Sequence, residues 1–533
     1  MQPARSAGIC AGTLGIACVA AFVALPLLGG ASVVRVAPIL LFALILTLLA
    51  ARPWTWSGDE WLAVGDWHPS DAAVRWAAIA AGLIVFWFVL TRFRAGGINA
   101  IDFTVYYDRP SWQTLLGRPL FIESADDPMR AYRTHFAVHA HWLMVPVAAL
   151  YFIAATPLWL LALSVVAVIV GAVYTLRIVQ FTGEGGLIAS ASAFAFVFND
   201  NTARTLNYGF HPEVLYAWFV PWMIHAGLRR RWTSFGLASL ACVSVKEDAF
   251  LLVFAAAVSV ALVAGRTLTR IERLVFLPAP VALATLNLIL YYGFVVPSLS
   301  ATGAPFYAAY WANYGPTAPT AAAGMLRHPM QVLTSTLTSP FFTRIILAHL
   351  YLPLIGWRWV AGIVPVIVLY GASANDQLRS FGIYYAIVLV PFLVLATARG
   401  AERLAGIVIT QQGRTRAVAS LVIVLGALLA GISNAGYSLR PWKEEISALP
   451  EFLHTLGREQ ALLVQSGLYP HAGYESRIQV LTPDTLHDQR YADATLVLAP
   501  GLSGYPLTSG DLDKLRLLPR VTEGRGLLAV RRR

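Results

Sequence analysis

The chain has 533 residues, of which 57% are hydrophobic and only 13% are charged, and its formal net charge is +11. Soluble domains carry about 25% charged residues, so this composition indicates a protein that crosses a membrane many times. The positive surplus lies among the apolar segments, whereas residues 441–533 carry equal numbers of acidic and basic residues. This distribution fits basic loops that set membrane topology and excludes a nucleic-acid-binding protein.

The three cysteines, Cys10, Cys18 and Cys242, all lie in apolar runs without the spacing of a disulfide or a metal site. We expect them to be buried small hydrophobic residues. The N-terminal apolar run, residues 9–28, is interpreted as an uncleaved first span, because further apolar runs follow at once.

A transmembrane helix needs about 20 mostly apolar residues. The apolar segments predict an α-helical polytopic membrane protein with about 11–14 transmembrane helices over residues 1–436, followed by a small α/β domain over residues 441–533. The candidate spans are residues 9–28, 34–51, 74–90, 158–179, 187–198, 214–228, 235–245, 249–264, 274–296, 345–357, 360–370, 383–396 and 417–432.

Basic loops assign the two sides of the membrane. Residues 229–231, 266–273 and 399–416 each carry several arginines, and the positive-inside rule places them in the cytoplasm. The alternation then requires residues 138–155 to form a juxtamembrane or re-entrant helix on the outer side. Residues 93–141, residues 297–343 and the C-terminal domain are therefore predicted to lie outside a bacterial inner membrane. Arg92 and Arg94, at the edge of the first outer loop, run against the rule.

The C-terminal segment changes character at about Pro441. Short β-prone runs at residues 461–464, 478–481, 495–498 and 527–530 alternate with turns. One helix is predicted over residues 509–517, with Ser509 as its N-cap.

The first outer loop carries the strongest candidate for chemistry. Asp102 follows a predicted span and has apolar neighbours, which would raise the pKa of its carboxyl and suit a general base. A helix N-cap is the structural alternative for Asp102. Asp108, which precedes Arg109 and Pro110, is a second candidate base, with a cap or an ion pair as its alternative.

Further ionisable residues gather on the predicted outer face. Lys246, Glu247 and Asp248 interrupt two apolar runs, where charges are costly unless they pair or face a water-filled cavity. They are expected to meet His211 and Glu213, because a tight hairpin of two spans returns its ends to one face. His135 and His139 are spaced to share a helix face. Together with His141 and Asp102, these two histidines could hold a divalent cation, which is an alternative interpretation of this cluster. The chain has no zinc signature, however, and we predict a site without a metal.

The motifs IDFTVYYDRPSW, THFAVH, GFHPE, KED and GIYYAIVLVPFLVLA resemble those of an uncharacterised prokaryotic membrane family, Domain of Unknown Function 2079. That family in turn resembles the GT-C superfamily of polytopic glycosyltransferases. The usual Asp-Leu-Gly of the family is Asp102-Phe103-Thr104 here, and the usual Asp-His-Phe is Thr134-His135-Phe136.

The resemblance implies a membrane glycosyltransferase that moves a sugar from a polyprenyl-phosphate donor to an extracytoplasmic glycan, lipid or protein acceptor. Asp102 would be the catalytic base, with Asp108 in reserve. Cations would hold the lipid phosphate. The residues expected to bind substrate are His135, His139, His211, Glu213, Lys246, Glu247, Asp248, Arg204 and Arg379. The alternatives are a lipid or solute transporter or flippase with a charged intramembrane cavity, and a non-catalytic membrane assembly subunit.

Overall fold

The computed structural model describes residues 67–123, 134–300, 306–409, 411–433, 437 and 439–532. The predicted spans over residues 9–28 and 34–51, together with Cys10 and Cys18, lie outside the described residues. Cys242 is fully buried, as predicted for a small hydrophobic residue.

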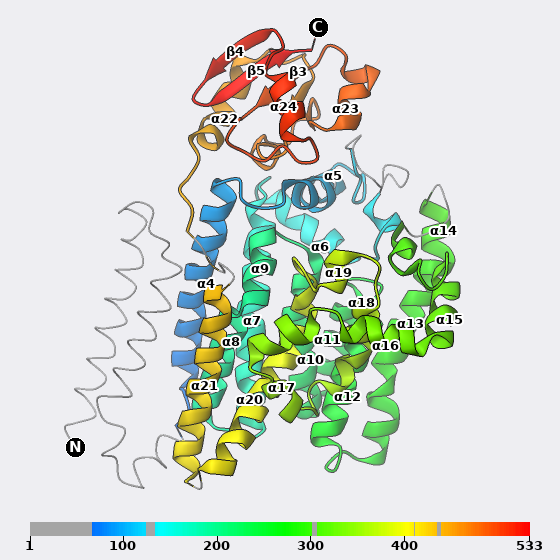
Figure 1. The fold of residues 1–533 in the computed structure, drawn as a ribbon, viewed down its shortest axis with the longest axis vertical. Helices are drawn as coiled ribbons and strands as arrows, with labels where there is room; N and C mark the ends of the chain where they lie inside the picture. Colours follow the sequence, from blue (N-terminus) through cyan, green and yellow to red (C-terminus); the bar gives the residue numbers. More distant parts are fainter. Residues whose placement is uncertain are drawn as a thin grey trace, which may run out of the picture.

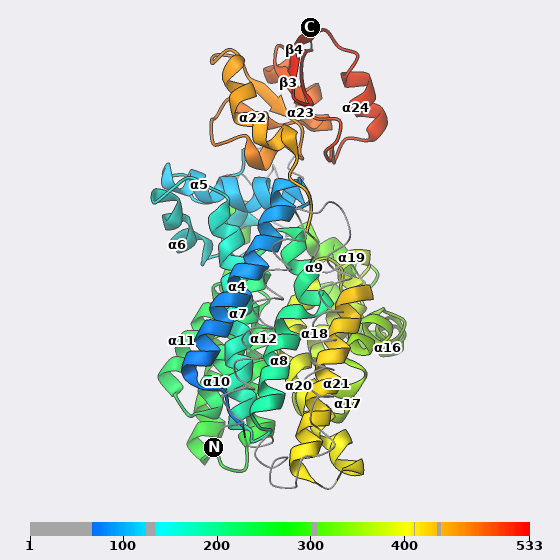
Figure 2. The same ribbon diagram turned by 90° about the vertical axis from the view of Figure 1, so that its left-hand side faces the viewer.

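A helical body makes up most of the molecule, and a small domain stands at one end of it (Figures 1 and 2). In the body α7 packs on α8 and α10, and α21 packs on α8 and α20. The longer helices are α4 (Asp71–Arg94), α7 (Leu158–Phe181), α8 (Gly186–Phe198), α9 (Asp200–Tyr208), α10 (Tyr216–Leu228), α11 (Trp232–Val243), α12 (Ala249–Ala264), α13 (Pro278–Leu290), α20 (Val390–Val408) and α21 (Gln412–Ser433).

Shorter elements connect the long helices. The α-helices are α5 (Arg109–Leu115), α6 (Met144–Ala148), α14 (Val296–Leu299), α15 (Ala318–Arg327), α16 (Pro329–Leu337), α17 (Leu352–Ile355), α18 (Val364–Gly371) and α19 (Asp376–Arg379). The 3₁₀ and π segments are η2 (Ile101–Asp108), η3 (His135–Ala137), η4 (Ala149–Phe152), η5 (Pro212–Leu215), η6 (Glu272–Phe276), η7 (Tyr291–Val295), η8 (Phe306–Trp311), η9 (Phe341–Ile346), η10 (Leu347–His349), η11 (Ala361–Ile363) and η12 (Tyr385–Leu389).

Within the described residues, four helices are long and apolar enough to cross a membrane: Asp71–Arg94, Leu158–Phe181, Glu272–Leu299 and Tyr385–Ile407. Shorter apolar helices accompany them at Trp232–Val243, Ala249–Ala264 and Ala361–Gly371. A mostly helical fold is thus confirmed, and the figure of 11–14 crossings stays a prediction.

One predicted span is wrong. Residues 345–357 do not form one helix, because Leu350 and Tyr351 adopt left-handed conformations with φ of 54° and 56° between η10 and α17. Left-handed residues cannot continue a right-handed helix. Residues 138–155 form only the short α6 and η4, which agrees with the prediction that this stretch is not a continuous crossing helix.

The C-terminal domain is an α/β unit, as predicted. Its sheet has the order β2-β1-β3-β5-β4, with β1 parallel to β2 and β3, and β5 antiparallel to β3 and β4. The strands are β1 (Leu462–Val464), β2 (Ile478–Val480), β3 (Thr495–Leu498), β4 (Arg520–Gly524) and β5 (Leu527–Arg531), and the helical segments are α22 (Glu444–Thr455), η13 (Tyr469–His471), α23 (Pro483–His487), η14 (Gln489–Tyr491) and α24 (Ser509–Leu515). The predicted N-cap of the last helix is wrong by one residue, because Thr508 caps α24 in a reciprocal capping box with Asp511.

The first loop and the C-terminal domain lie at the same end of the helical body (Figure 1). The guanidinium of Arg109 donates to the backbone carbonyls of Gly473 at 2.6 Å and Ile478 at 3.2 Å, and it stacks over the ring of Tyr469. The hydroxyl of Tyr474 donates to Asp108 at 2.8 Å. These buried contacts hold the domain against the loop.

The basic loops meet at the other end. Arg230 donates to the carbonyl of Thr267, so the loops after α10 and α12 touch. Arg416, near the start of α21, donates to the carbonyl of Gly183 at 3.0 Å. The arginine-rich loops therefore share one end, opposite the C-terminal domain (Figure 1), as the positive-inside rule predicts for helices that cross a membrane.

We expect the C-terminal domain to be extracytoplasmic. In a variant with Cys10, Cys18 and Cys242 replaced by alanine, Ser509→Cys should react with an impermeant maleimide in intact cells. Arg266→Cys should react only after permeabilisation, because it lies at the basic end. Both parent side chains are exposed, so labelling of Arg266→Cys alone in intact cells would invert this topology.

Candidate functional site

Three side chains of the short π-helix η2 contact three different parts of the molecule. Asp102, near its start, contacts α9, Tyr107 contacts the GFHPE segment, and Asp108 contacts the C-terminal domain. Stretches of π-helix are uncommon and often occur at functional sites. Within the predicted first loop, η2 is thus a buried helical element that joins three parts of the molecule.

Asp102 lies against a tyrosine and an asparagine. The hydroxyl of Tyr208 donates to Asp102 Oδ2. The amide of Asn99 donates to the Tyr208 hydroxyl oxygen at 2.7 Å, and the backbone N–H of Asp102 donates to Asn99 Oδ1 at 3.2 Å. Burial raises the pKa of the Asp102 carboxyl, and the hydrogen bond from Tyr208 offsets part of that rise. The carboxyl does not cap a helix N-terminus through its side chain, since the η2 boundary residues show no side-chain cap.

A cavity of about 630 Å³ lies beside this pair, between the helical body and the C-terminal domain. Asn99 and Tyr208 line it, whereas Asp102, which is hydrogen-bonded to both, is not itself a lining residue. Three arginines also line it, one from α4, one from α9 and one from the segment that leads to the C-terminal domain. The lining residues are Arg92, Gly97, Ile98, Asn99, Ala100, Ile101, Arg204, Asn207, Tyr208, Ile383, Arg440, Ser466, Ser503 and Tyr505.

The second cluster is a buried chain of charged groups. Lys246 Nζ donates to Glu213 Oε1 at 2.8 Å, and His211 Nδ1 bonds the other oxygen of Glu213. His211 Nε2 lies 2.8 Å from the Tyr107 hydroxyl. Asp248 Oδ2 lies 3.9 Å from Lys246 Nζ. These residues come together as the hairpin of α10 and α11 predicts, and Gly209, with φ of 110°, makes the turn that leads into them.

Lys246→Met is expected to destabilise the protein strongly. Glu213 is 1% exposed, and a buried carboxylate that loses its cation costs about 3–5 kcal/mol. The double variant Lys246→Met/Glu213→Gln removes both charges and should recover much of the loss in melting temperature. A double variant no more stable than Lys246→Met would show that the pair does not balance charge.

One aromatic ring, that of Tyr384, lies between the Asp102 cluster and the Lys246 cluster. The ring of Tyr384 stacks on His211, with centroids 3.5 Å apart, and its centroid lies 5.2 Å from that of Tyr208. The Asp102–Tyr208 pair and the His211–Glu213–Lys246 chain therefore flank the same ring.

Three histidines extend the second cluster. Glu247 accepts from His139 Nδ1 at 2.8 Å and from the backbone N–H of Ala140 at 3.0 Å. His135 and His141 are stacked and buried, and all four of their ring nitrogens lack a hydrogen-bond partner in the described part of the chain. The predicted helix face shared by His135 and His139 is wrong, because η3 ends at Ala137. No group of three or more His, Cys, Asp or Glu residues within the described ranges is arranged to hold a metal ion.

Asp108 occupies a different setting from Asp102. It is 2% exposed, and its Oδ1 accepts from Tyr151 at 2.6 Å and Tyr474 at 2.8 Å. Burial raises the pKa of its carboxyl to about 6. Asp108 thus joins the loop to the C-terminal domain, and unlike Asp102 its carboxyl accepts from two tyrosines that are not among the residues lining the cavity.

The cations nominated from the sequence do not converge. Arg204 lines the cavity beside Asp102, and its Nε is 2.6 Å from Asp200. Lys246 is neutralised by Glu213. Arg379 lines another cavity, beside α16. Sequence reasoning missed Arg92 and Arg440, although the breach of the positive-inside rule at Arg92 was a signal.

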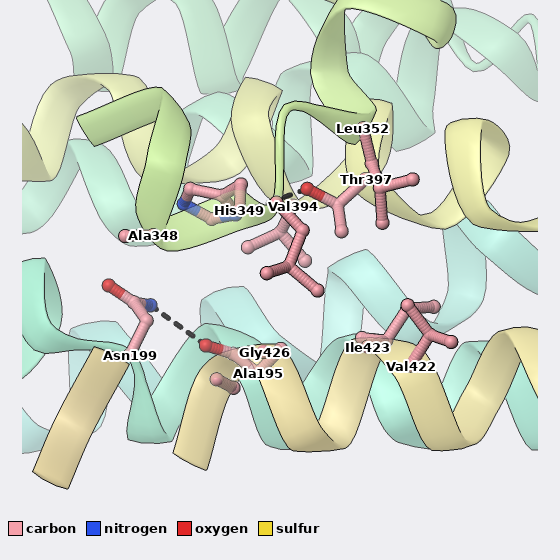
Figure 3. Close-up of a pocket in the computed structure, with 12 residues that line it drawn as sticks. Ala195, Asn199, Ala348, His349, Leu352, Val394, Thr397, Val422, Ile423 and Gly426 are labelled. Carbon is pink, nitrogen blue, oxygen red and sulfur yellow. Dashed lines mark hydrogen bonds between the residues drawn. The ribbon is translucent and has the colours of Figure 1, made fainter. Parts of the chain in front are cut away.

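A third, much smaller cavity of about 10 Å³ lies between α8, α21 and the broken segment around His349 (Figure 3). His349 Nδ1 lies 3.1 Å from the Thr397 hydroxyl, and Asn199 donates to the carbonyl of Ala195 at 2.8 Å. This volume is close to that of one water probe, so the cavity admits no organic substrate.

A family model described as "Predicted membrane protein (DUF2079)" matches residues 98–469. The chain belongs to this family. The matched range contains every candidate site residue named from the sequence, and it continues into the C-terminal domain.

No protein with a curated description matches the chain. Among solved structures, ArnT from Cupriavidus metallidurans bound to undecaprenyl phosphate has a TM-score of 0.46 and 11% identity, and the alignment covers 87% of this chain and 99% of that chain. The apo state of the same protein has a TM-score of 0.44 and 11% identity, with the same coverage.

Proposed function

We propose that the chain is a membrane glycosyltransferase that transfers a sugar from a polyprenyl-phosphate donor to an extracytoplasmic acceptor. The observation that carries the proposal is the cavity between the helical body and the C-terminal domain, which is lined by three arginines and by Tyr208, whose hydroxyl donates to Asp102. An anion site next to a carboxylate of raised pKa provides a leaving-group site and a base side by side.

The arginines fit a phosphate. Guanidinium groups bind phosphate oxygens through paired, charge-assisted hydrogen bonds. Arg92 lies in the last turn of α4, a helix long enough to cross the membrane, and its Nε donates to the carbonyl of Asn207 at 2.8 Å. The phosphate of a membrane-embedded lipid would lie near the end of this helix, where Arg92 could bind it. Such a role would explain why an arginine stands here against the positive-inside rule.

The proposed reaction is a direct displacement at the anomeric carbon of the sugar. The acceptor hydroxyl oxygen forms the new bond to this carbon, and its proton passes to the carboxylate of Asp102. The bond from the carbon to the phosphate oxygen breaks, and the lipid phosphate leaves with the electron pair. The arginines stabilise the charge that develops on the departing phosphate.

The remaining walls suit a sugar and its acceptor. Tyr208 presents an aromatic ring, which the buried Tyr384 contacts from behind, and Ser466, Ser503 and Tyr505 bring hydroxyl groups from the C-terminal domain. Ligand sites commonly combine such apolar faces with a few polar groups that fix orientation. The buried His211–Glu213–Lys246 chain stacks behind Tyr384 and would hold this wall in place.

The test is a transfer assay on the full chain in lipid nanodiscs, supplied with a panel of radiolabelled undecaprenyl-phosphate sugars and envelope extracts as acceptors. The proposal expects free undecaprenyl phosphate to be released in step with labelled acceptor. A transporter would move the intact lipid across a proteoliposome membrane without releasing the sugar, and that result would overturn the proposal.

A further inference from the structure

A second large cavity, of about 700 Å³, lies beside α16 on the flank of the helical body away from α4 (Figures 1 and 2). None of its lining residues lines the cavity beside Asp102. Most of them carry uncharged hydrogen-bonding groups, with one cation and one anion. They are Asn313, Met330, Gln331, Thr334, Ser335, Thr338, Ser373, Ala374, Asp376 and Arg379.

The helix α16 has three faces of different character. Successive residues of an α-helix turn by about 100°. Met330, Leu333 and Leu337 therefore form one stripe, and they are 70%, 48% and 55% exposed. Val332 and Thr336 form the buried face. Gln331, Thr334 and Ser335 form the third face, which lines the cavity.

The exposed apolar stripe borders the polar cavity directly. Met330 belongs to both, since it lines the cavity and is largely exposed. In a chain that belongs to a membrane-protein family, an exposed apolar stripe beside a polar face is the arrangement of an interfacial helix, whose apolar side lies in the acyl region. A ligand that fills both parts must have a polar head and an apolar tail.

Arg379 indicates the charge of that head. Its Nη2 donates to the Thr338 hydroxyl at 3.0 Å. Its Nε is buried and has no hydrogen-bond partner in the part of the chain that the structure describes. Among the described residues, no carboxylate forms an ion pair with Arg379. Because the Nε is buried, it does not face the cavity; a phosphate oxygen in the cavity would accept from the Nη groups of this arginine, whose positive charge has no carboxylate partner among the described residues.

We propose that this cavity binds an anionic phospholipid of the bilayer, with its phosphate on Arg379, its headgroup hydroxyls on Gln331, Thr334 and Ser335, and its acyl chains along Met330, Leu333 and Leu337. The site is separate from the cavity beside Asp102, so the proposal does not depend on glycosyl transfer. It concerns a lipid that the protein retains, whichever substrate it uses.

The test is native mass spectrometry of the full chain in a neutral detergent, titrated with phosphatidylglycerol. We expect saturable binding, weakened at least about tenfold in Arg379→Ala, which loses a charge-assisted hydrogen bond. Thr334→Leu, which places an apolar side chain on the polar face, should weaken binding similarly. Arg327→Ala removes an exposed arginine at the end of α15 and is the matched control; it should bind as the parent does. Melting temperatures identify any variant that fails to fold.

Three results would overturn the proposal. Equal binding by the parent and by folded Arg379→Ala and Thr334→Leu would place the lipid elsewhere. Equal displacement by phosphatidylcholine would show that the site does not select an anionic head. Displacement by undecaprenyl phosphate at lower concentration than by phosphatidylglycerol would assign the site to the lipid-linked substrate instead of a bilayer lipid.

Discussion

Asp102→Asn should reduce sugar transfer by about two to four orders of magnitude, the usual contribution of a general base. Asparagine has nearly the same size and its oxygen still accepts from Tyr208, so the surrounding contacts are retained, but it cannot take a proton. The measurement is the initial rate of transfer in nanodiscs, with melting temperature as the check on folding. Near-full transfer by folded Asp102→Asn would place the base elsewhere.

Asp108→Asn is the matched control for this loss. Asp108 lies on the same π-helix, and its oxygen accepts two tyrosine hydroxyls away from the cavity. An amide oxygen can accept both hydrogen bonds, so we expect transfer close to that of the parent protein. A loss equal to that of Asp102→Asn would mean that the helix, and not one carboxylate, is what activity requires.

The pH profile gives Asp102 a second signature. A base acts in its ionised form, and burial raises the pKa of this carboxyl. The rate should therefore fall as the pH drops through this raised pKa, at a higher pH than for an ordinary aspartate. Tyr208→Phe removes a hydrogen bond that lowers the pKa, so the fall should move to still higher pH.

Arg204→Ala should raise the KM for the lipid-linked donor about 10- to 100-fold, because a hydrogen bond to a charged partner contributes about 1.5–3 kcal/mol. Arg92→Ala/Arg204→Ala should weaken donor binding further, and added salt should have less effect on the double variant than on the parent. The measurements are donor titrations of the transfer rate and of undecaprenyl phosphate binding.

Arg118→Ala is the control for the loss of one positive charge. Arg118 lies on the first loop, and its 57%-exposed side chain pairs with Glu123. Its removal should leave the KM unchanged. If Arg118→Ala and Arg204→Ala raise the KM equally, the arginines act through the general potential of this end of the molecule, and not by contact with the donor phosphate.

The sequence predicted the bounds of those helices and strands that begin and end where an apolar or β-prone run begins and ends. The apolar run 249–264 coincides with α12, and the β-prone run 495–498 coincides with β3. The helix α9 was missed because it contains no apolar run; its local signals are the Asn199 N-cap, Asp200 in the first turn and Gly209 at its end. The break at Leu350 and Tyr351 lies inside an apolar run, so hydropathy does not mark it, although Pro353 follows it closely and favours a helix boundary.

One part of the candidate site, the cluster at the open end of the hairpin of α10 and α11, could be predicted from the sequence. His211, Glu213 and Lys246 flank α10 and α11, so their meeting follows from two antiparallel helices. The arginine cavity could not be inferred in this way. Arg92, Arg204 and Arg440 come from three segments far apart in the chain, and only the tertiary arrangement brings them to one wall.

The hydrogen bonds between Arg109 and the C-terminal domain couple the position of this domain to that of η2. Asp102 and Arg109 stand at opposite ends of one stiff segment, η2 and the start of α5, and Arg109 is anchored to three carbonyls of Gly473, Glu475 and Ile478. We therefore expect a tilt of the C-terminal domain to move η2 through these contacts, and with it the position of Asp102 relative to Tyr208.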